Sequence, residues 1–228
     1  MAQIPPRVIS ACSANRAVDL RQLLESGLDP DVTDDICRQT SLHIACEKGF
    51  MEIIRILLEF HADIHKPNGV WQSPLFIACK YRRVGCVRLL LEHGADPNQV
   101  FEMNGSTCLH VACEIDNITC ARLLLLKHAD PTKWDKTERT PLHIACDREH
   151  VDSVRLLLEH GVSPDLTTIS SGDTPLHLAC RRRNRVCIRL LLTYHADSTI
   201  KNTDGKTPLD IANEKRDIRC VRLLEEGV

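Results

Sequence analysis

The sequence predicts an all-α repeat fold, a solenoid of stacked helix-turn-helix units that are joined by β-hairpin-like loops. Three observations support this fold class. A four-residue pattern occurs six times at intervals of 33 or 34 residues. Each interval holds two apolar segments with helical spacing, and each ends in a stretch rich in Asp, Pro and Asn. A fixed period of this length is typical of repeat proteins, in which each unit buries its apolar face against the next.

The repeated pattern sets the boundaries of the units. The pattern is Thr or Ser, then in most copies Pro, then Leu, then in most copies His. It begins at Thr40, Ser73, Thr107, Thr140, Thr174 and Thr207. A degenerate earlier copy begins at Pro6, and its Ala11-Cys12 matches Ala45-Cys46 of the following unit. We therefore predict a single domain over residues 1–228, with units at 6–39, 40–72, 73–106, 107–139, 140–173, 174–206 and 207–228. The first and last units are more polar, and we expect them to cap the solenoid.

Local signals place two helices in each unit. Thr or Ser followed by Pro opens the first helix, because Pro is tolerated in a first helical turn. The second helix has apolar residues at 3.6-residue spacing. The residue that follows the second helix alternates between Gly and His along the chain: Gly27, Gly94 and Gly161 in odd units, and His61, His128 and His195 in even units. Both types accept the left-handed conformation that ends a helix, and the alternation indicates that a two-repeat block was duplicated.

Charge and cysteine usage restrict the class of protein. The formal net charge is −2, which favours neither nucleic acid nor a membrane surface as a partner. We find no apolar core of a signal peptide and no run of about 18 apolar residues that would span a membrane. Twelve cysteines recur mostly in register inside apolar segments. We therefore predict an intracellular protein of the cytoplasm, the nucleus or both, with reduced, buried cysteines, that is monomeric on its own.

A His-x-x-Cys pair recurs in the first helix of four units, at His43, His110, His143 and His177. Residues three apart share a helix face, so each pair offers two possible metal ligands. Neighbouring units lie about 10 Å apart, however, which is too far for one tetrahedral zinc to take two pairs. Phe76 and Asp210 replace the histidine in other units without disturbing the period. We therefore predict no metal site and no cofactor.

A second set of cysteines shares one position of the second helix, at Cys86, Cys120, Cys187 and Cys220. Other units have Asp19, Ile53 or Ser153 at this position, which indicates half-buried packing. A catalytic thiol needs one activated copy beside a base, not a series of equivalent copies. We predict that the protein is not an enzyme.

Arginine occupies one position of the second helix in every unit, and we expect it to face solvent on the convex side. This arginine ladder consists of Arg21, Arg55, Arg88, Arg122, Arg155, Arg189 and Arg222. Five of these arginines have a glutamate four residues further on, at Glu25, Glu59, Glu92, Glu159 and Glu226. The favoured interpretation is a solvated face of intrahelical pairs. The alternative is a basic stripe that binds an acidic ligand or nucleic acid.

The four-residue pattern, the helix pair and the turn together resemble the ankyrin repeat family over residues 6–228. The resemblance implies that the repeated histidine ties each turn to the adjoining unit by hydrogen bonds. It also implies that protein partners bind a concave face made of first-helix ends and hairpin tips. On this chain the helix ends carry Tyr81, Ile115, Arg148, Arg181 and Arg182, and the hairpin tips carry Trp71, Gln72, Phe101, Met103, Trp134 and Arg139.

Aromatic and arginine side chains make this face the predicted partner-binding site. Both tryptophans and Phe101 lie at or near hairpin tips, and Trp and Arg are enriched among binding hot spots. Arg181, Arg182 and Arg183, with Arg185 and Arg148 near them, form a basic patch that suits an acidic segment of the partner. The alternative is that the tryptophans only cover neighbouring hairpins.

The Ala-Cys pair after the repeated pattern and the segment 71–79 resemble the ankyrin-repeat-and-SOCS-box proteins. In that family the repeats select substrates for a cullin-based ubiquitin ligase, and we expect no SOCS box within these 228 residues. Our main hypothesis is a non-catalytic scaffold or adaptor that binds a protein partner. The alternatives are a substrate-recognition module of such a ligase, a free-standing inhibitor, and a spacer that holds two partners apart.

Overall fold

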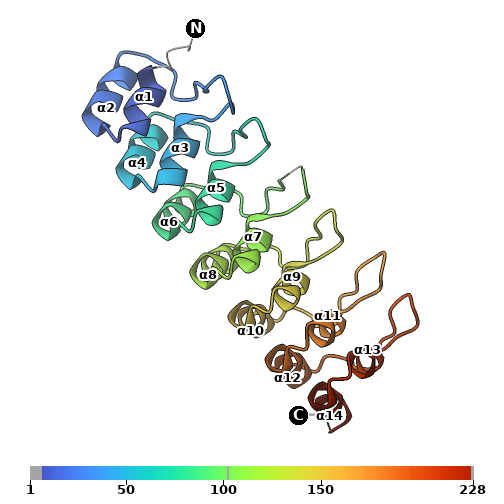
Figure 1. Ribbon diagram of the computed structural model, residues 1–228. Helices are drawn as coiled ribbons and strands as arrows, with labels where there is room; N and C mark the ends of the chain where they lie inside the picture. The colour runs from blue at the N-terminus through green and yellow to red at the C-terminus, as the bar shows by residue number, and fades with distance from the viewer. Residues whose placement is uncertain (1–6, 102, 227–228) are drawn as a thin grey trace. The chain divides into compact units, whose positions relative to one another are not determined.

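The computed structural model describes residues 7–101 and 103–226, so the predicted start at Pro6 lies outside the described residues. Over the described part of the chain, fourteen α-helices alternate with loops, and extended pairing is limited to two isolated β-bridges. The helices are α1 (Arg7–Ser13), α2 (Ala17–Glu25), α3 (Ser41–Lys48), α4 (Met51–Glu59), α5 (Pro74–Lys80), α6 (Val84–Glu92), α7 (Cys108–Glu114), α8 (Ile118–Leu126), α9 (Pro141–Asp147), α10 (Val151–Glu159), α11 (Pro175–Arg182), α12 (Arg185–Thr193), α13 (Pro208–Glu214) and α14 (Ile218–Glu226) (Figure 1). The predicted all-α repeat fold is confirmed.

The chain divides into two compact parts, each of several repeats, which are called the first and the second unit from here on. The first unit comprises residues up to Val111 together with Leu126–Ala129. The second unit comprises Ala112–Leu125 together with the residues from Asp130 onward. The single domain and the exact repeat boundaries that we expected from the sequence stay a prediction.

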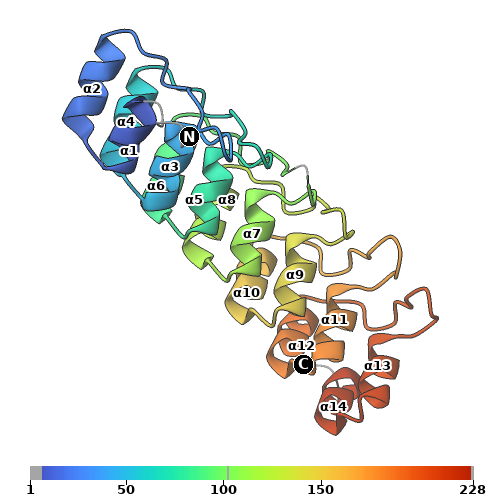
Figure 2. The same cartoon turned by 45° about the horizontal axis from the view of Figure 1, so that its top comes forward.

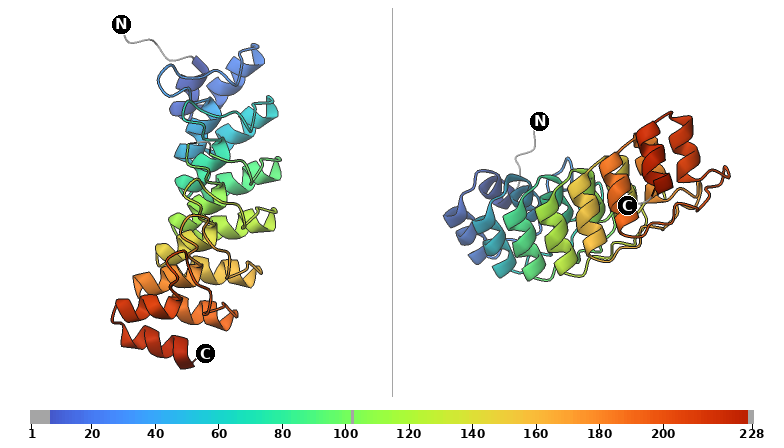
Figure 3. Two further views of the ribbon diagram at one scale, coloured as in Figure 1. Left: turned by 90° about the vertical axis from the view of Figure 1, so that its right-hand side faces the viewer. Right: turned by 90° about the horizontal axis from the view of Figure 1, so that it is seen from below.

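Each unit contains two rows of helices. In the first unit, α1, α3 and α5 pack in file and form one row, while α2, α4 and α6 form the other (Figure 2). In the second unit, α9, α11 and α13 form one row, and α10, α12 and α14 form the other. Figure 3 shows the same order within each unit from two further sides. Because each helix pair is thin, its apolar face is buried only by the pairs on either side.

The repeated four-residue pattern starts the first helices as its chemistry predicts. Thr140, the residue before α9, has an extended backbone, and its side chain accepts a hydrogen bond from the backbone N–H of His143. Pro141 follows in the first turn, where its missing N–H has no intrahelical partner. The same cap begins α5, α11 and α13, at Ser73, Thr174 and Thr207.

The core consists of small and aliphatic side chains. Leu42 and Leu57 are fully buried in the first unit, as are Leu142 and Leu157 in the second. Each buried leucine contributes roughly 1.5–3 kcal/mol through removal of its apolar surface from water. Among the described residues, no helix is both long enough and apolar enough to cross a membrane.

The turns after α2, α4, α6, α8, α10 and α12 confirm the left-handed conformation that was predicted for the alternating Gly and His. Gly27 has a φ of +87° and His61 a φ of +60°, both in the left-handed region. The other members of the two series, Gly94, Gly161, His128 and His195, also have positive φ. Each of these residues leads into a loop and then a hairpin, which carries the chain to the next first helix.

Candidate protein-binding surface

The repeated histidine connects neighbouring repeats. The backbone N–H of Thr140 donates to Nδ1 of His143 at 3.2 Å, so the neutral ring carries its proton on Nε2. Nε2 lies 3.2 Å from the carbonyl oxygen of Asp173, just before the next first helix. Equivalent bonds join His43 to the carbonyl of Gln72 at 2.9 Å, and His177 to the carbonyl of Lys206 at 3.0 Å. The structural role that the family resemblance implied is confirmed.

Burial sets the protonation of these histidines. It lowers the pKa of His43 and of His143 to about 4, and it also lowers the pKa of His177. The rings are therefore neutral at physiological pH. No group of three or more His, Cys, Asp or Glu side chains is arranged to hold a metal ion in the part of the chain that the structure describes.

The cysteines are more buried than the sequence suggested. Cys86, Cys120, Cys187 and Cys220 are at most 1% exposed, so the expectation of half-buried packing was wrong. The second helices face inward at this position, where Ile53 and Ser153 are also fully buried. Burial raises the pKa of Cys187 to about 12, which leaves little of the nucleophilic thiolate at neutral pH. All twelve cysteines are free, and only Cys37 is exposed.

The arginine ladder faces solvent, but its ion pairs differ from the prediction. Arg21 forms two hydrogen bonds of 2.8 Å to Glu59 of the next second helix, not to Glu25 of its own helix. Arg55 pairs with Glu52, three residues earlier, at 3.6 Å. The predicted pairing four residues on is therefore wrong for both arginines. Arg-then-Glu is the weaker order within a helix, and the neighbouring second helix lies within reach. An acidic ligand for this ladder stays a prediction.

Three successive hairpins of the first unit carry exposed apolar side chains. We call this set the tip surface: Ile36 is 92% exposed, Val70 44%, Trp71 52%, Val100 42% and Met103 64%. In the second unit, Ile169 occupies a comparable hairpin and is also exposed. Exposed apolar groups of this kind mark interaction sites when they are clustered.

Side-chain and backbone hydrogen bonds hold these hairpins. Oδ1 of Asn68 accepts from the backbone N–H groups of Val70 and Gln72 at 3.1 and 3.0 Å. The N–H of Gly69 donates to the carbonyl of Cys37 in the preceding hairpin at 2.8 Å. The tips are therefore fixed both internally and against their neighbours.

Trp71 has an unfavourable backbone conformation. Its φ is +63°, in the left-handed region, where a bulky residue is an outlier. Gly105, Gly172 and Gly205 have the same conformation at the equivalent position of three other hairpins. Glycine adopts this conformation without steric cost, whereas a larger residue there destabilises the fold by about 1 kcal/mol or more.

The other predicted tip residues are less accessible. Phe101 is half-buried, and its ring centroid lies 5.0 Å from that of Phe76. Trp134 is half-buried too, at 5.8 Å from the ring of His143. Gln72 is buried. These three residues support the hairpins, while Met103 and Trp71 point their apolar surface to solvent.

The predicted helix-end residues differ in the same way. Tyr81, just after α5, is exposed, and the Lys80 ammonium lies 5.9 Å from its ring centroid. Ile115, just after α7, is half-buried. Tyr81 therefore offers more contact area to a partner than Ile115 does.

Three arginines of the predicted basic patch are already paired within the chain, whereas Arg183 donates to the carbonyl oxygen of Lys215. Arg148 lies 2.7 Å from Glu114, Arg182 lies 2.8 Å from Asp147, and Arg181 lies 3.0 Å from Asp173. These pairs link side chains of neighbouring repeats. Arg139 likewise lies 3.5 Å from Asp147 and 3.8 Å from Asp135. An acidic partner segment would have to compete with these carboxylates.

Ile36, Val70, Val100 and Ile169 are exposed aliphatic residues that were not predicted from the sequence. The signal was present, because an isolated aliphatic residue inside a turn rich in Asp, Asn and Ser has no core to join. Aromatic and arginine residues defined the predicted site, and these positions are neither.

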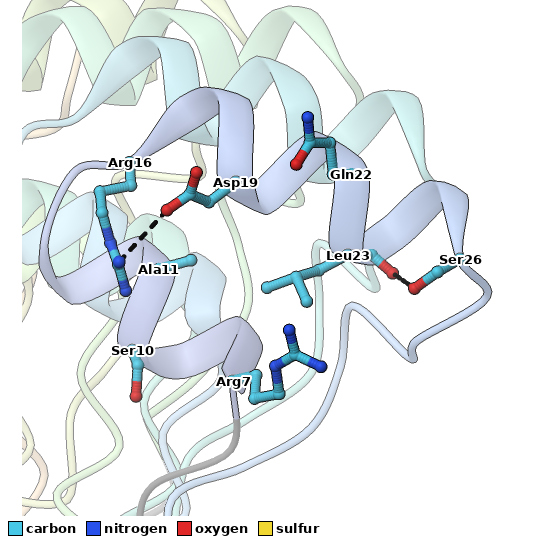
Figure 4. A pocket seen from close by; sticks show the side chains of 8 residues that line it. All are labelled: Arg7, Ser10, Ala11, Arg16, Asp19, Gln22, Leu23 and Ser26. Atoms are coloured by element: carbon cyan, nitrogen blue, oxygen red, sulfur yellow. Dashed lines mark hydrogen bonds and ion pairs between the residues drawn. The ribbon is translucent and has the colours of Figure 1, made fainter.

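An open hollow of about 600 Å³ lies beside α1 and α2 (Figure 4). It is lined by Arg7, Ser10, Ala11, Arg16, Asp19, Gln22, Leu23 and Ser26. Arg16 pairs with Asp19 at 3.2 Å across its rim. The lining mixes both charges with amide, hydroxyl and apolar groups, so it presents no coherent chemistry for one ligand.

Paired helices, capping threonines and histidine bonds between neighbours define a helical repeat protein. The family model for ankyrin repeats (3 copies) matches residues 8–101, 98–168 and 163–228. The chain belongs to the ankyrin repeat family.

Two solved structures illustrate the likeness. The human ASB11 ankyrin repeat domain is 31% identical, with a TM-score of 0.77, and the match covers 96% of this chain and 97% of that one. The ankyrin repeat domain of Bcl-3, a member of the IkappaB protein family, is 28% identical, with a TM-score of 0.87, and the match covers 95% of this chain and 98% of that one. The resemblance to ankyrin-repeat-and-SOCS-box proteins is supported by the first match. A search of curated proteins gave no match.

Ankyrin repeat domains generally mediate protein–protein interactions and generally lack catalytic activity. Because 609 solved chains resemble this one, the fold alone does not identify a partner. The choice of partner depends on the side chains that the scaffold displays.

Proposed function

We propose that this protein is a non-catalytic scaffold or adaptor that binds a protein partner through the tip surface and the adjoining first-helix ends. The observation that carries the proposal is Trp71. It is half-exposed at a hairpin position with a positive φ, where three other hairpins have glycine and two have Arg38 and Glu138. A large aromatic side chain that is half-exposed on an ordered hairpin favours contact with a partner.

The chemistry of the tip surface favours an apolar segment of the partner. Trp71, Met103 and Ile36 offer large side chains whose burial releases water, and tryptophan is among the most frequent hot-spot residues. Tyr81, in the turn after α5, offers the partner a second contact through its ring and its hydroxyl group. The second unit offers a separate polar surface, where an acidic partner group can exchange with Asp147 or Glu114.

The proposed setting is intracellular, in the cytoplasm, the nucleus or both, with the chain monomeric until it meets its partner. The twelve free cysteines support this setting, because disulfides form and persist in oxidising compartments.

A capture experiment with matched variants tests the proposal. The wild type, a Trp71→Gly/Met103→Ala variant and a Val18→Ala/Leu126→Ala control are immobilised and exposed to a cell extract. Glycine is chosen at position 71 because other hairpins have it there, so the fold should be kept, which circular dichroism verifies. Val18 and Leu126 are equally exposed apolar residues of second helices.

We expect the control to recover the same proteins as the wild type and the tip variant to lose them. Some single interface residues contribute 2 kcal/mol or more, so a loss of about thirtyfold in affinity is expected for a hot spot. Equal recovery by all three proteins would refute the assignment of the tip surface.

A second candidate function is substrate recognition for a cullin-based ubiquitin ligase. The likeness to the ankyrin repeat domain of human ASB11 favours it. If it holds, proteins captured by the tip surface gain ubiquitin when the wild type is overproduced in cells, and do not when the tip variant is. Unchanged ubiquitination of the captured proteins would exclude the ligase role and leave the scaffold role intact.

A further inference from the structure

Four arginines surround a hollow between two interhelical turns of the second unit. The turns are those between α11 and α12 and between α13 and α14 (Figure 1). We call this site the arginine hollow; its volume is about 310 Å³, and Arg183, Arg185, Arg216, Asp217, Ile218 and Arg219 line it. All four arginines are exposed, so their guanidinium groups are accessible to a ligand.

The one carboxylate in the arginine hollow does little to neutralise it. Oδ1 of Asp217 accepts hydrogen bonds from the backbone N–H groups of Arg219 and Cys220 at 3.1 and 3.2 Å, so Asp217 serves as the cap of α14. Its Oδ2 lies 3.9 Å from Nε of Arg185, which is a long contact for an ion pair. The Asp217 charge is therefore shared between a helix end and one arginine.

The remaining guanidinium groups have no anionic partner of their own. Arg183 donates through Nη2 to the carbonyl oxygen of Lys215 at 2.7 Å, which fixes it across the two turns and leaves its other donors available. Within residues 7–101 and 103–226, Arg216 and Arg219 form no ion pair. The site is thus a concentration of positive charge that the fold does not neutralise.

We propose that the arginine hollow binds a phosphorylated side chain of a protein segment. A phosphate carries close to two negative charges at pH 7 and three acceptor oxygens, and planar guanidinium groups bind it in bidentate geometry. The exposed aliphatic side chains of Ile218 and Val186 stand beside the arginines at the starts of α14 and α12. An aliphatic residue next to the phosphorylated one would pack against them.

The neighbouring turns argue against an extended polyanion. At the position of Arg183 and Arg216, the two preceding repeats have Asp116 and Glu149, so the basic surface stops at the arginine hollow. A nucleic acid strand or an anionic membrane that reached beyond the hollow would meet these carboxylates. None of the residues that line the hollow is aromatic, so bases have no ring to stack on.

This site goes beyond the proposed function because its residues belong to interhelical turns of the second unit, whereas the tip surface consists of hairpin residues of the first unit. A hairpin leads into the start of each first helix and follows the end of each second helix, whereas the interhelical turn lies at the far end of the pair. A partner bound at the hairpins and a phosphorylated segment bound at the turns would not compete for the same side chains.

Fluorescence anisotropy with peptide libraries tests the proposal. The probe is a fluorescein-labelled nonapeptide library with a central phosphoserine and random flanks, compared with the same library carrying serine. The test variants are Arg216→Glu/Arg219→Glu and the milder Arg216→Gln/Arg219→Gln, which should keep the fold because both side chains are exposed. The control, Arg155→Glu/Arg189→Glu, makes the same change of charge on two exposed arginines of the second unit.

We expect the wild type to bind the phosphoserine library about tenfold more tightly than the serine library, because two or three charge-assisted hydrogen bonds depend on the phosphate. Both test variants should lose this preference, and the control should keep it. The absence of phosphate-dependent binding by the wild type, or an equal loss in the control, would overturn the proposal. Co-sedimentation with phosphatidylcholine–phosphatidylserine vesicles, without binding to phosphopeptide, would overturn it in favour of a membrane site.

Discussion

The buried histidines of the first helices should make the stability of the protein depend on pH. Burial lowers the pKa of His43 and His143 from 6.5 to about 4, so the native protein keeps both rings neutral where the unfolded chain already binds protons. Their contribution to stability is complete above pH 6.5 and is lost as the pH falls from 6.5 to 4. His177 has a lowered pKa as well and acts in the same direction.

The size of the effect follows from the two pKa values. At pH 5 the unfolded histidine is almost fully protonated and the native one is not, which destabilises the fold by about 2 kcal/mol for each of His43 and His143. Below pH 4 the loss approaches about 3 kcal/mol for each. Carboxylates with a lowered pKa, such as Asp173 and Asp210, stay ionised at pH 5 and lose their contribution to stability only at lower pH. The loss of stability between pH 7 and pH 5 therefore comes chiefly from the histidines.

Urea unfolding at pH 7 and pH 5, followed by circular dichroism, measures this loss. A His143→Phe variant is the test, because Phe76 occupies the same position of α5 and shows that the fold accommodates phenylalanine there. We expect the variant to be less stable at pH 7 but to lose about 2 kcal/mol less than the wild type on acidification. His65→Ala, which changes an exposed histidine, is the control. The reasoning fails if His143→Phe and the wild type lose equal stability between pH 7 and pH 5.

Three further predictions concern packing and thiol access. Leu157→Ala should destabilise the fold by about 2–5 kcal/mol and Leu126→Ala, at an exposed site, by less than about 0.5 kcal/mol, in urea titrations. Gly69→Ala places a Cβ 2.7 Å from the backbone carbonyl oxygen of Cys37 and should lower the free energy of unfolding by about 1–3 kcal/mol. Gly85→Ala meets only the flexible side chain of Met51 and should be close to neutral. Equal melting temperatures of the two variants would contradict this expectation. A thiol-reactive aromatic disulfide should modify Cys37 alone in the native protein and all twelve cysteines in denaturant, and absorbance gives both counts.

Most of the fold was predictable because each repeat contains the residues that start and end its own helices. Thr140 and Pro141 start a helix, Gly161 ends one, and the same signals return every 33 or 34 residues. Repetition turns a weak local signal into a strong one, since independent copies agree. The histidine bond between repeats was implied by the family resemblance and not by the spacing of the residues.

The details of the surface were less predictable because they depend on distances between repeats. The partner of Arg21 is Glu59, and it could not be chosen over Glu25 without knowing how closely α2 and α4 approach. The pairing of Arg182 with Asp147 depends on the same kind of contact. The exposure of Ile36 depends on the path of a hairpin, which a turn-rich composition does not define.

The hydrogen bonds between neighbouring hairpins have a consequence for kinetics. Gly69 is bonded to Cys37 in the first unit, and Thr203 is bonded to Ser171 in the second, so the backbone at these tips is ordered before any partner arrives. A docking event then restricts only side-chain rotamers and requires no loop to fold. We expect such a surface to associate at the rates of a rigid body, about 10⁵–10⁷ M⁻¹ s⁻¹, so that differences in lifetime distinguish one bound protein from another.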